Sequence, residues 1–198
     1  MRLTILDKYI LSSYVPLFII AQAVLSLIIG AGQSDIVGRV DLSNHVLACP
    51  VAGAFAACLL FSDLAKYGEL RALSAGGISL GRLIISPASF TIAIIAVLAL
   101  TSGFTSTVTD VFLYKGLVAV CGGVVSVTIA AILASKFARL DPGAAWLGSF
   151  GFIVAFYICA LLIAVFSRQL VLSSVIVLSI SVLAMLAIGW LQAIRAKP

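Results

Sequence analysis

The chain has 198 residues, of which 63% are hydrophobic and only 10% are charged, and its formal net charge is +5. Soluble domains carry about 25% charged residues, so this composition excludes a soluble globular domain and indicates a protein that crosses a membrane several times. On such a protein the excess of basic residues reports membrane orientation rather than nucleic-acid binding.

Six long runs contain no charged residue: 9–34, 42–62, 83–109, 116–135, 142–167 and 169–194. Each has about the 20 residues that a helix needs to cross the hydrocarbon of a bilayer. A helix satisfies its own backbone hydrogen bonds there, so we predict an all-α membrane protein with six transmembrane helices. The first run is longer than the core of a signal peptide, and we expect a retained first span. Residues 1–198 then form a single transmembrane domain with no periplasmic domain.

Small residues recur in two of these runs. The second holds Ala48, Ala52, Gly53, Ala56 and Ala57, and the fourth holds Gly122, Gly123 and Ser126. Small side chains let helix backbones approach closely, which for most of these positions predicts packing within the chain.

The lysines and arginines are distributed unevenly between the connectors. With the N-terminus inside, nine of them lie in cytosolic segments and three, Arg39, Lys115 and Arg168, lie outside. Cytosolic segments are normally the richer ones, so we predict that both termini are cytosolic. The outer connectors are too short for a folded domain such as a jelly roll.

Segment 63–82 is the most polar part of the chain and must lie outside the hydrocarbon. Its charged residues are Asp63, Lys66, Glu69, Arg71 and Arg82. Good helix formers occupy 69–73, and Gly76-Gly77 can end a helix because glycine tolerates the left-handed conformation. We predict a short surface helix over 67–75 that presents Glu69, Leu70 and Leu73 to the cytosol. An ordinary loop with one helical turn is the alternative.

Several chemistries have no support in the sequence. The charge-free runs argue against a secondary carrier, which usually keeps ionisable groups at membrane depth. Cys49, Cys58, Cys121 and Cys159 all lie in apolar runs and are expected to be small buried hydrophobic residues. His45 is expected to be an interface residue. We predict no catalytic, cofactor or metal site, and without a P-loop motif any ATP must be hydrolysed by another subunit.

Residues 68–79 read GELRALSAGGIS, which resembles the cytosolic coupling segment of the LptF/LptG permease family, whose consensus is close to SELTALRAAGIS. The matching positions are Glu69, Leu70, Ala72, Leu73, Ala75, Gly77, Ile78 and Ser79. The start of the chain, LDKYIL at residues 6–11, is similar to that family's LDRYIL.

This resemblance implies the permease subunit of an ABC transporter that moves a lipid or a lipopolysaccharide-like glycolipid out of the bacterial inner membrane. It implies two partners: an LptB-like ATPase dimer, which binds the ATP and Mg, and a second permease subunit, in a homodimer or heterodimer with spans one and five in contact. It also implies that Glu69, Leu70, Ala72, Leu73 and Gly77 form the ATPase-coupling site. Glu69 would meet a basic residue, and Leu70 and Leu73 would enter a groove of the ATPase.

The chain departs from the family in one large respect, since a short connector replaces the periplasmic β-jellyroll between spans three and four. A minimal lipid permease is therefore expected. Two alternatives stay open: a non-transporting scaffold or regulatory subunit with the permease fold, and, with less support, a channel or carrier.

Overall fold

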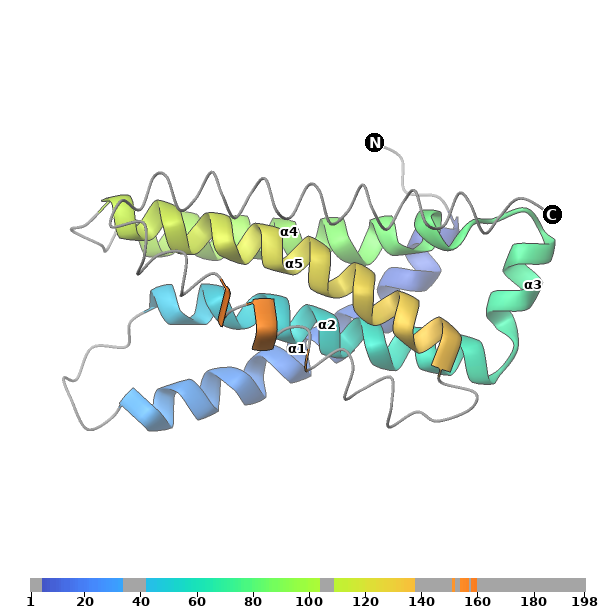
Figure 1. Cartoon of the computed structure of the whole chain (residues 1–198), viewed down its shortest axis with the longest axis horizontal. Helices are drawn as coiled ribbons and strands as arrows, with labels where there is room; N and C mark the ends of the chain where they lie inside the picture. Colours follow the sequence, from blue (N-terminus) through green and yellow to red (C-terminus); the bar gives the residue numbers. More distant parts are fainter. Residues whose placement is uncertain are drawn as a thin grey trace.

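The computed structural model describes residues 5–33, 42–103 and 109–137, and beyond them residues 151, 154–156 and 158–159. The first three ranges form α1 (Ile5–Gln33), α2 (Leu42–Lys66), α3 (Glu69–Ala75), α4 (Leu80–Gly103) and α5 (Thr109–Phe137), shown in Figure 1. No strand occurs in these described ranges, and the all-α prediction is confirmed for them.

Within the described ranges, four helices are long and apolar enough to cross a membrane. Their candidate spans are Ile5–Ile28, Ala48–Lys66, Leu80–Thr101 and Gly116–Lys136. At 1.5 Å per residue the 24 residues of α4 extend about 36 Å, more than the roughly 30 Å of hydrocarbon. These spans correspond to the first four predicted runs. The predicted spans over 142–167 and 169–194, and with them the count of six, lie almost wholly outside the described residues.

The centre of the described bundle is the pair α2 and α5. In their candidate spans 72% and 67% of the residues are buried, against 22% and 33% in α1 and α4. The most extensive helix contact joins α2 to α5, and α1 and α4 pack around this pair. Figure 1 shows α3 at one end of the bundle, running across the direction of α2 and α4.

Small residues explain the close approach of these helices. A Cβ atom added to Gly53 of α2 would lie 3.0 Å from Thr91 Cγ2 and 3.1 Å from Val127 Cγ2, and one added to Gly123 of α5 would lie 3.0 Å from Ile95 Cδ1. Ala52, Ala56 and Ala57 are fully buried. The prediction that these residues serve packing within the chain is confirmed here.

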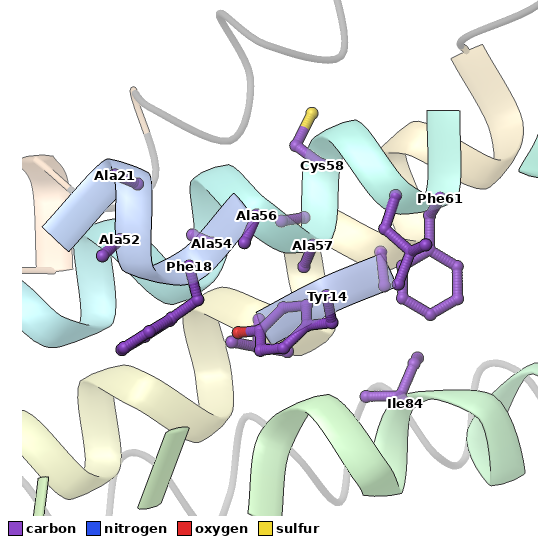
Figure 2. Close-up of a cluster of buried hydrophobic side chains, with 14 of the residues drawn as sticks. Tyr14, Phe18, Ala21, Ala52, Ala54, Ala56, Ala57, Cys58, Phe61 and Ile84 are labelled. Atoms are coloured by element: carbon purple, nitrogen blue, oxygen red, sulfur yellow. The ribbon is translucent and has the colours of Figure 1, made fainter. Parts of the chain in front are cut away.

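Aromatic residues fill the remaining space between α1, α2 and α4. Tyr14 and Phe18 of α1 lie beside the alanines of α2 (Figure 2), and both are buried. The Phe90 ring of α4 meets both of them edge-on, with centroids 6.1 Å from Tyr14 and 5.5 Å from Phe18. This geometry is favoured by aromatic quadrupoles, and it ties α1 to α4.

The polar segment 63–82 is not one loop. Asp63 and Lys66 belong to the last turn of α2, and Arg82 belongs to the first turn of α4. The helices thus extend past the charge-free runs, because a charged side chain at the end of a helix can reach the interface. What remains between α2 and α4 is α3 with a short connection on each side.

Candidate functional site

The candidate site is α3 with its two connections. Gly68 lies in the turn after α2 and is the N-cap of α3, in the left-handed conformation with φ 78°. Its carbonyl accepts hydrogen bonds from the amides of Arg71 and Ala72. A left-handed residue is strained for any side chain with a Cβ, so glycine suits this corner. The sequence predicts a helix over 67–75. In the structure the helix begins two residues later, at Glu69, because Gly68 is in the left-handed conformation and interrupts the helix there.

The other end of α3 is closed by a Schellman motif. The Gly77 amide donates to the Ser74 carbonyl and the Ile78 amide to the Leu73 carbonyl, both at 3.0 Å, and Gly77 has φ 80°. These bonds satisfy carbonyls that a helix end would leave unpaired. The expected helix stop at Gly76-Gly77 is confirmed, with Gly77 as the left-handed residue.

The two faces of α3 differ. Leu70 and Leu73 are half-buried and pack against the hydrophobic core of the bundle. Arg71, Ala72 and Ala75 are exposed. The spacing of Leu70 and Leu73 therefore marks the face that seats α3 on its own bundle, while the opposite face is accessible to a partner.

Glu69 is held by the first helix. The Tyr9 hydroxyl donates a hydrogen bond to Glu69 Oε2 at 2.7 Å. Tyr9 precedes Glu69 by 60 residues, so this bond joins the chain start to the start of α3. Among the described residues, Tyr9 is the partner shown for this carboxylate.

A second contact joins the same turn of α1 to α4. Asp7 is buried, and its carboxylate accepts hydrogen bonds from the Arg82 guanidinium at 2.9 Å and the Ser86 hydroxyl at 2.5 Å. A buried carboxylate is costly unless it is paired and hydrogen-bonded, and Asp7 has both kinds of partner. We call the two contacts, Tyr9–Glu69 and Asp7–Arg82–Ser86, the α1 clasp. It holds the segment containing α3 on both sides.

The sequence does not predict the clasp. Asp7 and Tyr9 belong to the LDKYIL stretch at residues 6–11, and Arg82 belongs to the distant polar segment 63–82. Asp7 is a charged residue beside a long apolar run, which indicates that its side chain needs a polar partner. Nothing in the local sequence indicates that this partner is Arg82, 75 residues away.

His45 lies in the first turns of α2, at the other end of the bundle. Its Nδ1 atom is 3.1 Å from the Ser26 hydroxyl of α1, and its carbonyl accepts a bond from the Gln22 amide at 3.3 Å. It is half-buried and joins α1 to α2. This is an interhelical packing role.

The cysteines differ from one another. Cys49, Cys58 and Cys121 are buried, which confirms the expectation for them, whereas Cys159 is exposed, which corrects it. Within the part of the chain that the structure describes, no group of three His, Cys, Asp or Glu side chains is arranged to hold a metal ion.

The five predicted coupling residues are brought together only in part. Glu69, Leu70, Ala72 and Leu73 lie on α3, whereas Gly77 shapes the connection after it. Ala72 is exposed, Glu69 is half-buried, and Leu70 and Leu73 both pack against the bundle.

No family model, no curated protein and no solved structure matches this chain.

Proposed function

We propose that this chain is the membrane permease subunit of an ABC transporter of Lpt type, which moves a lipid or glycolipid by means of ATP hydrolysed on a separate ATPase. The observation that carries the proposal is the Tyr9–Glu69 hydrogen bond. The two stretches that resemble the LptF/LptG family are 6–11 and 68–79, and this bond brings them together at one end of the bundle.

The arrangement of α3 supports the coupling role. The helix lies between two candidate spans and leaves Arg71, Ala72 and Ala75 exposed. Its contacts with α2, and the clasp on either side, would pass a displacement of α3 on to α1 and α4. A partner that binds the exposed face of α3 and displaces it can therefore move the membrane helices α1 and α4.

In this proposal Glu69 offers its second carboxylate oxygen to an Arg or Lys of the ATPase while Tyr9 holds the first. Ala72 sits in the contact, and the accessible parts of Leu70 and Leu73 border the ATPase groove. Small interfaces depend on a few buried anchors, each contributing about 1–3 kcal/mol. Truncating one partner of a buried charge pair costs about 2–5 kcal/mol.

The proposal includes a second permease subunit in the inner membrane. The described part of α1 exposes Ile19, Ile20, Val24 and Leu27, each more than half accessible. This apolar face suits contact with a second subunit as well as with lipid. In native mass spectrometry we expect an ATPase-coupled complex with two permease subunits, either two copies of this chain or one copy with a related permease. A coupled complex with a single permease subunit would contradict this part.

The test is co-purification of the ATPase with variants of α3, together with ATPase activity in lipid nanodiscs. We expect Glu69→Lys to weaken assembly or uncouple hydrolysis, because it sets like charges together. A charge reversal on the ATPase should partly restore it. Leu73→Asp should release the ATPase, but Leu73 also seats α3 on the bundle.

Ala72→Trp separates these two effects, because Ala72 is exposed and its replacement leaves the bundle contacts intact. We expect a folded protein that no longer retains the ATPase. Lys66→Ala is the matched control at the same end of the bundle and should retain it. If Glu69→Lys and Ala72→Trp leave both assembly and hydrolysis unchanged, the chain is a scaffold or regulatory subunit instead.

A further inference from the structure

A cavity of about 370 Å³ opens beside α3, within the size range of small-molecule sites. Arg71 and Ser74 of α3 and Ser135 and Lys136 of α5 supply its polar lining. Apolar side chains that include Leu80 and Leu83 of α4 supply the rest. The candidate spans begin at Leu80 and end at Lys66 and Lys136, so the cavity lies where the chain leaves the hydrocarbon.

The cavity is positively charged. Arg71 and Lys136 are both exposed, and the ion pair found among the described residues is Asp7–Arg82, which involves neither of them. Two cations at the membrane boundary, beside an apolar wall, favour a ligand with a phosphate at one end and a hydrocarbon at the other. Basic pockets between transmembrane helices recognise anionic headgroups in this way.

The two serines add a further preference. The Ser74 hydroxyl donates to the Arg71 carbonyl at 2.9 Å, and the Ser135 hydroxyl donates to the Ile132 carbonyl at 2.8 Å. Both hydroxyl protons are thus engaged, and the oxygens remain available as acceptors. A ligand that carries hydroxyl donors next to its phosphate complements this lining.

We propose that the cavity binds the headgroup of an anionic phospholipid of the phosphatidylglycerol class. Its phosphate lies between Arg71 and Lys136, and its glycerol hydroxyls donate to Ser74 and Ser135. The start of its acyl chains runs along Leu80 and Leu83. A choline or ethanolamine headgroup carries a cation of its own, which would be repelled by Arg71 and Lys136. The site needs only the chain and a membrane, so it stands independently of the ATPase proposal.

The experiment uses the full chain, purified and stripped of lipid in detergent. Phosphatidylglycerol or phosphatidylcholine is added back, and bound lipid is counted by native mass spectrometry. The variants are Arg71→Gln, Lys136→Gln and their combination. Lys66→Gln is the matched control, because Lys66 lies at the same end but stacks 5.8 Å from the Tyr67 ring, outside the cavity lining.

We expect the unchanged chain to prefer phosphatidylglycerol. Each single variant should lower its affinity about fivefold, the usual contribution of one cation near an anionic surface. The double variant should lose the preference, and Lys66→Gln should keep it.

Four results would overturn the proposal. These are equal binding of the two lipids by the unchanged chain, a preference that survives in the double variant, and an equal loss in Lys66→Gln. The fourth is saturation by inorganic phosphate without retention of phosphatidylglycerol, which would indicate a free-phosphate site. The second of these results, if the double variant also loses an acidic protein partner, would indicate that the cavity is a protein contact instead.

Discussion

Thr91 shows how a single polar side chain can fix the packing of three helices. Its hydroxyl donates to the Pro87 carbonyl of its own helix at 3.0 Å and shares a 2.8 Å hydrogen bond with the Tyr14 hydroxyl of α1. Tyr14 supplies the proton of that shared bond, and the Gly53 carbonyl of α2, 3.1 Å from the Tyr14 hydroxyl, accepts the same proton. Thr91 and Tyr14 are fully buried, and buried hydroxyl groups are stable when they are hydrogen-bonded. The network therefore fixes the distance between α2 and α4.

This geometry predicts the effect of a larger side chain at position 53. Gly53→Val places new atoms against Thr91, which cannot rotate away without breaking its bonds. Overpacking of this kind costs about 1–3 kcal/mol. We expect a lower midpoint of thermal unfolding in detergent micelles. Gly116→Ala is the control, because its new Cβ would lie 4.0 Å from Ala99 Cβ, and it should be neutral or stabilising.

At the scale of elements, α3 is held by contacts outside itself. It has only seven residues, and isolated helices below about 12–15 residues are marginal in water. The helix is stabilised by the packing of Leu70 and Leu73 against the bundle and by the α1 clasp. Gly68 and Gly77, which flank it at positive φ, let the chain turn at its two ends.

The ion pair of the clasp can be measured with a double-mutant cycle on Asp7→Asn and Arg82→Gln. The Asp7 side chain is 9% exposed and that of Arg82 is 37% exposed, so the pair is neither fully buried nor a surface pair. We expect a coupling energy of about 1–2 kcal/mol, between the values of those two classes. Unfolding midpoints of the four proteins supply the cycle, and additive effects would show that the pair contributes nothing.

The connection after α3 offers a test of its backbone conformation. Gly77 has φ 80° and Gly76 has φ −77°, although the two residues are adjacent. Gly77→Ala should destabilise the connection by about 1–2 kcal/mol, because the left-handed conformation is strained for alanine. Gly76→Ala should have little effect. Hydrogen exchange of the α3 amides measures both, and equal protection in the two variants would contradict the Schellman assignment.

At the scale of the whole molecule, the four candidate spans among the described residues indicate a membrane protein, and α3 lies at one end of the bundle. The helix α4 separates α3 from Thr101 by a full span. The distribution of the basic residues predicts that the α3 end of this bundle is cytosolic.

Cysteine labelling tests this orientation in a background without the four native cysteines, of which Cys159 is exposed. Ala75→Cys places an exposed thiol at the end of α3, and Thr101→Cys places one near the far end of α4. A membrane-impermeant maleimide should label position 101 in intact cells and position 75 only after permeabilisation. Labelling of position 75 from outside would reverse the topology.

The sequence by itself determined the positions of the first four spans, because hydrocarbon excludes charges and a helix must be about 20 residues long to cross it. It also determined where α3 ends, because Gly77 can adopt the left-handed conformation that the helix stop needs. The tertiary structure alone decided that Leu70 and Leu73 face the bundle, since their spacing defines a common face but not its partner. It also decided the partners of Asp7 and Tyr9. A polar side chain shows locally that it needs a hydrogen-bond partner, but helix packing selects which distant residue meets it.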